Sequence, residues 1–297
     1  MALDADQIEK PVRKLRNLIK KMRSVPSIEQ VHDLRTNSRR MEAMLQALSL
    51  DSTGNGRRIL KELSRLRKRA GKVRDMDVLT GYVARLPAQG DEKECSVQLL
   101  EHLGAERQKQ AKRLYRETQQ HAPDLRKRLK RTTGELENLL PQNGSEESSG
   151  NAASADAGAS ALRLLSELAQ PMRLSRANLH PYRLKVKELR NVLRMADQSK
   201  DQEFLKTLGE VKDAIGEWHD WEELVAIAKE ELKHDANCGL IRELKKIADE
   251  RYEIALAQAE AMRKEYLRVS NRGKRATNTR ERGPGEPVWS ATAALVA

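Results

Sequence analysis

Apolar residues recur along most of the chain at positions i, i+3, i+4 and i+7, which is the spacing of an amphipathic helix. Ser27 followed by Gln30 is typical of a capping box that opens one of these helices. In the first half, the pattern predicts helices near residues 6–22, 28–49, 56–70, 74–86, 91–121 and 124–139. In the second half, it predicts helices near residues 161–172, 179–197, 202–215, 218–233 and 239–268.

Composition agrees with an all-helical fold. Aromatic residues make up only 3% of the chain, with a single Phe, so a β-sheet would have few of the side chains that it prefers. Leu, Ala, Glu, Lys, Arg and Gln, which are strong helix formers, dominate instead. Hydrophobic residues reach 38% and charged residues 34%, which together indicate helices with wide solvated faces. We therefore expect an all-α protein.

A polar segment separates two helical halves. Residues 141–160 read PQNGSEESSGNAASADAGAS, a composition that buries too little apolar surface to order itself. The end of the chain is rich in Gly, Pro and Arg and has the same character. We expect a first helical half at 1–140, a disordered linker at 141–160, a second helical half at 161–270 and a disordered tail at 271–297.

The two halves repeat one another in two blocks. VHDLR, beginning at Val31, and RRME, beginning at Arg39, correspond to LHPYR and KELR 148 residues later. A second block pairs at an offset of 145 residues, where Leu60, Lys61, Leu63, Gly71, Asp75 and Leu79 correspond to Leu205, Lys206, Leu208, Gly216, Asp220 and Leu224. Because both blocks occur in the same order, an internal duplication explains them best. It predicts two similar antiparallel helical bundles.

Local features of the repeat affect the expected helix boundaries. Gly71 and Gly216 are expected to end one helix before the next begins. Pro181 would remove a backbone hydrogen bond if it lay inside a helix. We therefore expect its helix to start near Asn178, which places His180 at a helix N-terminus, where exposed N–H groups favour an anion.

Positive charge is concentrated in the first half. The chain carries 56 Lys and Arg against 44 Asp and Glu, a net charge of +12. Residues 1–140 hold 31 basic and 19 acidic residues, whereas the remainder holds 25 of each. A basic half predicts an anionic partner bound through counterion release. A basic surface that only keeps the protein soluble would explain the charge equally well.

The repeated block places cationic side chains on one stripe of a helix, at about 100° per residue. A single such stripe is usually a solvated face, but a merely solvated face has no reason to repeat its histidine. The repeat therefore favours two stripes that grip an extended anion, since Arg and Lys both suit phosphate oxygens. The stripes consist of His32, Arg35 and Arg39 in the first half, and of His180, Arg183, Lys187 and Arg190 in the second.

The blocks VHDLRTNSRRMEAML and LKELSRLRKRAGKVRDMDVL, with their second-half counterparts, resemble the CHAD family, the conserved histidine α-helical domain. The resemblance covers about residues 8–268, interrupted by the linker. It implies two similar helical bundles related by a pseudo-twofold axis, with basic residues lining a groove or pore. It also implies that inorganic polyphosphate binds there without catalysis, and some members of the family lie at polyphosphate granules.

The resemblance further implies which residues contact polyphosphate. They are His32, Arg35, Arg39 and Arg40 in the first half, His180, Arg183, Lys187 and Arg190 in the second, and also Lys61, Lys206 and Arg74. Neither half carries a full set, because Glu188 stands opposite Arg40 and Glu42 opposite Arg190. The E-x-E-x-K strand of an attached triphosphate-tunnel domain does not occur, so we expect a standalone CHAD domain.

Two other functions are compatible with the charge pattern. Nucleic-acid binding is the first, although the chain has few aromatic residues for stacking on bases, and Trp218 and Trp221 fit core positions. Phosphoryl transfer or hydrolysis is the second, with His32 or His180 as acid–base group or phosphoryl acceptor. A P-loop and a metal-binding cluster are both missing from the sequence, and the pair of Asp75 and Asp77 lacks a third ligand. We expect no catalysis, no cofactor and no metal.

The sequence also indicates where the protein works. Cys95 and Cys238 form neither a disulfide framework nor a metal motif, which favours a reducing cytoplasm. The N-terminal residues lack the apolar core of a signal peptide, and no apolar run approaches the ~18–20 residues of a membrane helix. We expect a cytoplasmic protein, placed at polyphosphate granules if the resemblance holds, and its oligomeric state stays open.

Overall fold

The chain is helical throughout the part that the structure describes. The computed structural model describes residues 5–47, 50–87, 91–139, 150–170, 173–195, 202–232 and 238–267. All regular structure in these segments is α-helical apart from one 3₁₀ turn, so the prediction of an all-α fold is confirmed. None of the helices in these segments is long and apolar enough to cross a membrane.

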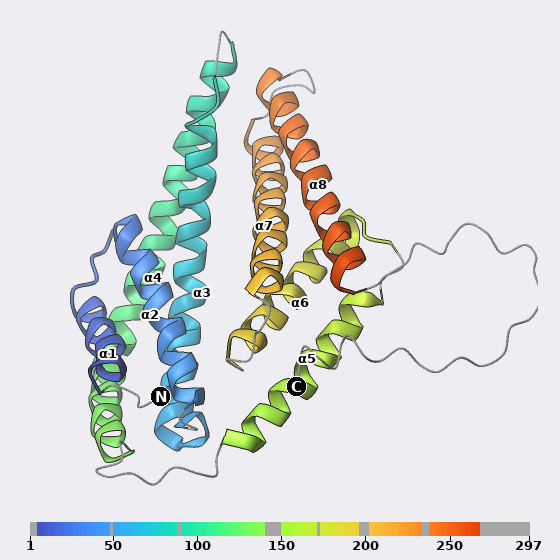
Figure 1. Ribbon diagram of the computed structural model, residues 1–297. Helices are drawn as coiled ribbons and strands as arrows, with labels where there is room; N and C mark the ends of the chain where they lie inside the picture. Colours follow the sequence, from blue (N-terminus) through green and yellow to red (C-terminus); the bar gives the residue numbers. More distant parts are fainter. Residues whose placement is uncertain are drawn as a thin grey trace, which may run out of the picture. The chain divides into compact units, whose positions relative to one another are not determined.

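The chain divides into two compact units, whose helices are labelled in Figure 1. The first unit holds α1 (Ala5–Lys20), α2 (Ile28–Ala47), η1 (Leu50–Ser52), α3 (Gly54–Val83) and α4 (Asp91–Leu139). The second unit holds α5 (Gly150–Ala169), α6 (Arg176–Met195) and most of α7 (Gln202–Glu231) and α8 (Gly239–Tyr266). The segment Glu230–Leu240, which connects α7 to α8, groups with the first unit.

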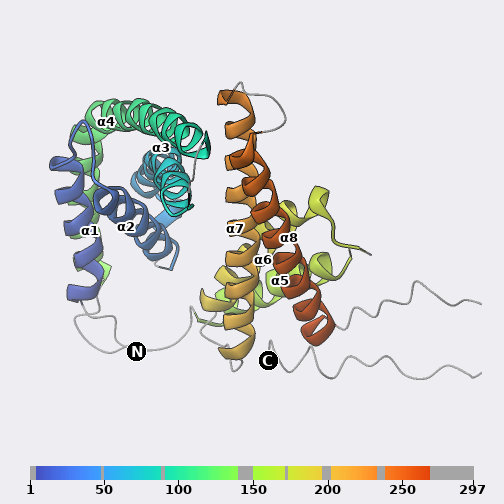
Figure 2. The ribbon, with the colours of Figure 1, turned by 90° about the horizontal axis from the view of Figure 1, so that it is seen from above.

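The four long helices of the first unit share one core. α3 packs against α2 and α4, and α1 packs against the same two helices, as Figures 1 and 2 show. Leu34 of α2, Leu63 of α3 and Leu114 of α4 are all buried in this core. Burial of each such side chain contributes about 1.5–3 kcal/mol, which makes the amphipathic pattern of these helices the main source of their stability.

The second unit has a core of its own, to which α5, α6, α7 and α8 all contribute. The rings of Phe204 on α7 and Tyr266 on α8 stack with their centroids 4.5 Å apart. Residues that correspond in the sequence repeat are buried in both cores, as in the pairs Met41 and Leu189, Leu45 and Leu193, and Leu63 and Leu208. The repeated blocks therefore occupy equivalent places in two separate cores.

Several predicted helix boundaries are wrong. Gly71 lies inside α3 and Gly216 inside α7, and neither ends a helix. Likewise, α4 continues through Pro123, where two helices were expected. A glycine costs a helix only about 1 kcal/mol, and burial spread over many turns of α3 and α7 offsets this cost. The pattern located the helical segments, but the expected breaks within them do not occur.

The starts of α5 and α6 also differ from expectation. α5 begins at Gly150, so residues 150–160 of the predicted disordered linker are helical. This segment is rich in Ala, the strongest helix former, and leads into the buried Ala161. The rest of the linker, 141–149, and the predicted tail at 271–297 lie outside the described residues.

α6 begins at Arg176, not near Asn178, and contains Pro181. The backbone N–H of Ser175 donates to Oδ1 of Asn178 over 2.8 Å, so Asn178 closes the start of the helix from within its first turn. His180 is consequently the fifth residue of α6, and its expected place at the exposed N-terminus is wrong. The capping box of α2 is confirmed, because Ser27 and Gln30 exchange two hydrogen bonds of 3.2 Å.

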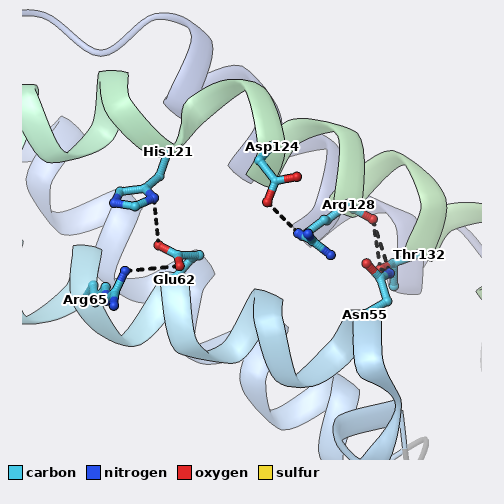
Figure 3. A network of polar contacts seen from close by, with 7 residues as sticks. All are labelled: Asn55, Glu62, Arg65, His121, Asp124, Arg128 and Thr132. Carbon is cyan, nitrogen blue, oxygen red and sulfur yellow. Dashed lines mark hydrogen bonds and ion pairs between the residues drawn. The ribbon is translucent and has the colours of Figure 1, made fainter.

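Polar contacts also join α3 to α4, as Figure 3 shows. Glu62 of α3 pairs with His121 of α4 over 3.1 Å. Two turns toward the start of α3, the side chain of Asn55 donates to the hydroxyl of Thr132 over 3.0 Å. These bonds hold α3 in a fixed register along α4.

Candidate functional site

The guanidinium group of Arg35 on α2 lies against the backbone of α3. Its Nη1 donates to the carbonyl oxygen of Arg67 over 3.4 Å. A Cβ atom on Gly71 would come within 2.8 Å of the same nitrogen, which is closer than side chains approach one another. Because Gly71 has no side chain, it leaves the space that the guanidinium group of Arg35 occupies. We call a guanidinium group held in this way at a helix glycine an arginine seat.

Other guanidinium groups surround Arg35. Burial lowers the pKa of Arg35, and the positive charge of Arg39 lowers it further. Asp75 acts in the opposite direction, whereas Arg74 and Arg67 add to the lowering. Four arginines from two helices thus repel one another across a short distance. We call Arg35, Arg39, Arg67 and Arg74 the α2–α3 cluster.

Two carboxylates partly neutralise this cluster. Glu42 of α2 forms a two-pronged ion pair with Arg67, in which Nη2 of Arg67 lies 3.2 Å from Oε1 of Glu42. Asp75 lies 3.5 Å from Nη1 of its neighbour Arg74. With four arginines against two carboxylates, the α2–α3 cluster keeps a net positive charge. Such a surface attracts multivalent anions.

Sequence reasoning did not include Arg67 among the site residues. Its spacing of seven residues from Arg74 places the two on one face of α3, which is the signal that could have found it. Arg40 and Lys61, in contrast, are exposed away from the cluster. By helical geometry Arg40 lies about 140° around α2 from Arg35, and Lys61 about 120° around α3 from Arg67. His32 is also exposed, with Nε2 3.4 Å from the hydroxyl of Thr36.

The second unit repeats the seated arginine. Nε of Arg183 on α6 donates to the carbonyl oxygen of Lys212 on α7 over 3.1 Å. A Cβ on Gly216 would lie 2.7 Å from Nη2 of Arg183. In the sequence repeat, these three residues correspond to Arg35, Arg67 and Gly71. Each unit therefore holds an arginine in the same way at matching positions.

A further arginine of α6 lies against α7, two helical turns after Arg183. Nε of Arg190 donates to the carbonyl oxygen of Leu205 over 3.2 Å, and a Cβ on Gly209 would lie 3.2 Å from the same nitrogen. Arg190 corresponds to Glu42 in the first unit. The second unit therefore has an arginine at the position where the first unit has the carboxylate that pairs with Arg67. We call Arg183 and Arg190 the α6 arginine row.

His180 stands at the start of this row. Its ring lies against that of His219 on α7, with the centroids 4.2 Å apart. Burial lowers the pKa of His180, and the charges of His219 and Arg183 lower it further. The lowered pKa disfavours the charged form of His180, so the α6 arginine row owes its positive charge to Arg183 and Arg190.

The remaining predicted residues of the second unit lie on α6 and α7. Lys187 is half-buried on α6. Lys206 is exposed and lies 3.8 Å from Glu210 of the same helix. Glu188, which interrupts the second stripe in the sequence, pairs with Arg163 of α5 over 3.8 Å. Glu188 thus directs its charge toward α5.

Comparison with known proteins identifies the fold family. A family model, the CHAD domain, matches residues 6–229 of the chain. The chain belongs to the CHAD domain family. The crystal structure of the CHAD domain from the plant Ricinus communis is similar, with a TM-score of 0.54 and 17% sequence identity. The match covers 89% of this chain and 93% of that chain, and at this identity it shows the fold alone. No curated protein matches the chain.

The fixed arginines of this CHAD domain have several N–H donors each. A guanidinium group has five N–H donors, and the backbone bonds described above each occupy one of them on Arg35, Arg183 and Arg190. Charged donors of this kind make short, strong bonds to phosphate oxygens. Because each group is already fixed, it loses little conformational freedom when an anion binds.

The structure explains one of the two neighbouring carboxylates, Asp75 and Asp77. Asp77 was weighed as a metal ligand together with Asp75. Its side chain is buried, and Oδ1 lies 2.5 Å from Nε of Arg107 on α4. Asp77 therefore links α3 to α4 and serves the fold.

Proposed function

We propose that this CHAD domain binds inorganic polyphosphate through the α2–α3 cluster and the α6 arginine row. The observation that carries the proposal is the arginine seat, which occurs in both units at matching positions, at Gly71 and at Gly216. An extended chain of phosphates offers negative charge at regular intervals, so several fixed guanidinium groups can each meet a phosphate. Neither bases nor sugars are needed for such contacts.

The aromatic side chains support polyphosphate over nucleic acid. Proteins that bind single strands stack bases on exposed aromatic rings. Trp218 and Trp221, the tryptophans among the described residues, are 4% and 6% exposed and belong to the helix packing of the second unit. They present no ring face to a base, which leaves charge as the main means of recognition.

We also infer that binding occurs without catalysis. A histidine that accepts or moves a phosphoryl group is usually oriented by a carboxylate. Nε2 of His32 instead meets the uncharged hydroxyl of Thr36. We expect no release of phosphate when the protein is incubated with polyphosphate, and we expect a fluorescent fusion to gather at polyphosphate granules.

A salt-dependent competition tests the proposed function. Long-chain polyphosphate and single-stranded nucleic acid of equal total charge compete for the protein at several salt concentrations. We expect polyphosphate to be preferred at each concentration, with an affinity that falls steeply as salt rises and that increases with polyphosphate chain length. Equal affinity for pyrophosphate and for a long chain, or a preference for nucleic acid, would overturn the proposal.

A further inference from the structure

Glu42 occupies two N–H donors of the α2–α3 cluster. Its carboxylate oxygens accept hydrogen bonds from Nη1 and Nη2 of Arg67, and the bond from Nη2 spans 3.2 Å. A guanidinium group binds a phosphate in the same two-pronged way. The carboxylate of Glu42 therefore lies on Arg67 where a phosphate group would bind, and the two anions exclude one another.

This ion pair lies where an anion from solvent can reach it. The side chain of Arg67 is 22% exposed and that of Glu42 is 32% exposed. Ion pairs that water reaches contribute little net free energy, because solvent screens both charges. Glu42 can therefore leave Arg67 when a more strongly held anion arrives. A chain of phosphates is held by several arginines at once, so it can displace a carboxylate that is held by one.

The second unit has a different pair of residues at the matching positions. Arg190 stands where the first unit has Glu42, and Lys212 stands where it has Arg67. Arg190 donates to the backbone of α7, and Lys212 pairs with the adjacent Asp213 of its own helix over 2.5 Å. At this position, a carboxylate from the facing helix covers a cation in the first unit and not in the second.

We propose that Glu42 is an intramolecular competitor that limits the affinity of the α2–α3 cluster for polyphosphate. This role rests on the function proposed above and adds to it the regulation of one site by an acidic residue. Polyphosphate displaces Glu42 before Arg67 can bind it, so breaking the ion pair offsets part of the binding free energy. Removing the carboxylate should therefore tighten binding. If Glu42 only positioned Arg67 for the ligand, its removal would weaken binding.

Titrations of the full chain with long-chain polyphosphate test the proposal. The main variant, Glu42→Gln, keeps the shape of the side chain and removes its charge, and Glu42→Ala is a second variant. Asp33→Asn is the matched control, because Asp33 is an exposed carboxylate of the same helix, about 180° around α2 from Glu42. Arg67→Gln, alone and combined with Glu42→Gln, completes a double-mutant cycle. Circular dichroism checks that each variant is folded.

We expect Glu42→Gln to bind polyphosphate roughly threefold to tenfold more tightly than the wild-type protein, which corresponds to the net value of one hydrogen bond. The slope of its salt dependence should rise by about one unit, since one more cation meets a phosphate. Asp33→Asn should change the affinity by less than about twofold, because solvent screens a charge on the far side of the helix. With Arg67→Gln already present, Glu42→Gln should bring no gain.

Three results would overturn the role of Glu42 while polyphosphate still binds the wild-type protein. They are unchanged or weaker binding by both Glu42 variants, an equal gain in Asp33→Asn, and a full gain of Glu42→Gln in the presence of Arg67→Gln. Failure of the proposed function is distinguishable, because the wild-type protein itself would then bind a long chain no more tightly than pyrophosphate, and both proposals would fall.

Discussion

Arg35 and Arg183 show what a glycine inside a helix can contribute to a binding residue. Each guanidinium group rests on α3 or α7 where Gly71 or Gly216 leaves room, and each donates to a carbonyl oxygen one turn earlier. An arginine on an open surface moves among many rotamers, and binding must pay about 2 kcal/mol to fix it. The seat reduces this cost before the anion arrives.

Replacing Gly71 with Ala should weaken polyphosphate binding without lowering the stability of the fold. Alanine favours the helix by about 1 kcal/mol over glycine, and the clash with Arg35 involves the end of a flexible side chain. We expect the free energy of unfolding to stay level or rise by up to about 1 kcal/mol. Polyphosphate affinity should fall by roughly threefold to tenfold, which corresponds to the net value of one ordinary hydrogen bond. Denaturant melts and binding titrations measure the two effects.

Gly104→Ala is the control for this experiment. Gly104 lies in α4, and a Cβ there would meet no atom within 4 Å. This variant should gain helix stability and keep the wild-type affinity. If Gly71→Ala binds polyphosphate as tightly as Gly104→Ala does, the seat has no role in binding.

Part of the candidate site was predictable from the sequence. Arg35 and Arg39 share one stripe of α2, and the periodic pattern was enough to place them together. The spacing of seven residues pairs Arg67 with Arg74, whereas the contact of Arg67 with Glu42, 25 residues away on another helix, required the fold. Arg40 came from the family resemblance, although helical geometry alone turns it away from Arg35. Whether His32, Lys187 and Lys206 touch polyphosphate stays a prediction.

At the scale of helices, the apolar pattern predicted which segments are helical but not where each helix stops. Glycine and proline impose local penalties of about 1 and 3 kcal/mol. A helix of 30 residues such as α3 or α7 buries many side chains along its length, and this gain outweighs one local penalty. The penalty follows from the residue type and can be predicted from the sequence. The burial that offsets it depends on the partner helices.

Pro181 offers a test of where α6 begins. Because the helix starts at Arg176, the proline ring removes the backbone bond to Ala177, four residues earlier. Pro181→Ala should restore this bond and raise the free energy of unfolding, by up to about 3 kcal/mol. Thermal melts followed by circular dichroism measure the change. An unchanged or lower midpoint would mean that α6 starts later, with Pro181 in its first turn.

At the scale of the whole chain, two units each have a core, and the chain crosses between them more than once. Glu230–Leu240 groups with the first unit although it connects two helices of the second. Sγ of Cys238 in this segment lies 3.5 Å from Sγ of Cys95 on α4, and no disulfide joins these two cysteines. This approach could not be predicted from the sequence, because 143 residues separate the two thiols.

Mild oxidation should join these two thiols. A disulfide needs about 2.05 Å between its sulfur atoms, so a small movement suffices. Hydrogen peroxide should convert the two thiols to an intramolecular disulfide, with release of two water molecules per bond. Non-reducing gels should show a faster band that disappears in Cys95→Ser and in Cys238→Ser. Formation of intermolecular dimers alone would contradict the grouping of Glu230–Leu240 with the first unit.

We propose that the seated arginines and their neighbours bind polyphosphate. The most direct measurement compares two charge-reversed proteins, Arg39→Glu with Arg74→Glu in the α2–α3 cluster, and Arg116→Glu with Arg131→Glu on the exposed side of α4. Both change the net charge by the same amount, and all four residues are exposed, so circular dichroism should show both proteins folded. We expect the cluster variant to lose at least about tenfold in affinity for long-chain polyphosphate, and the slope of its salt dependence to fall by about two units. Equal affinities for the two variants would contradict this proposal.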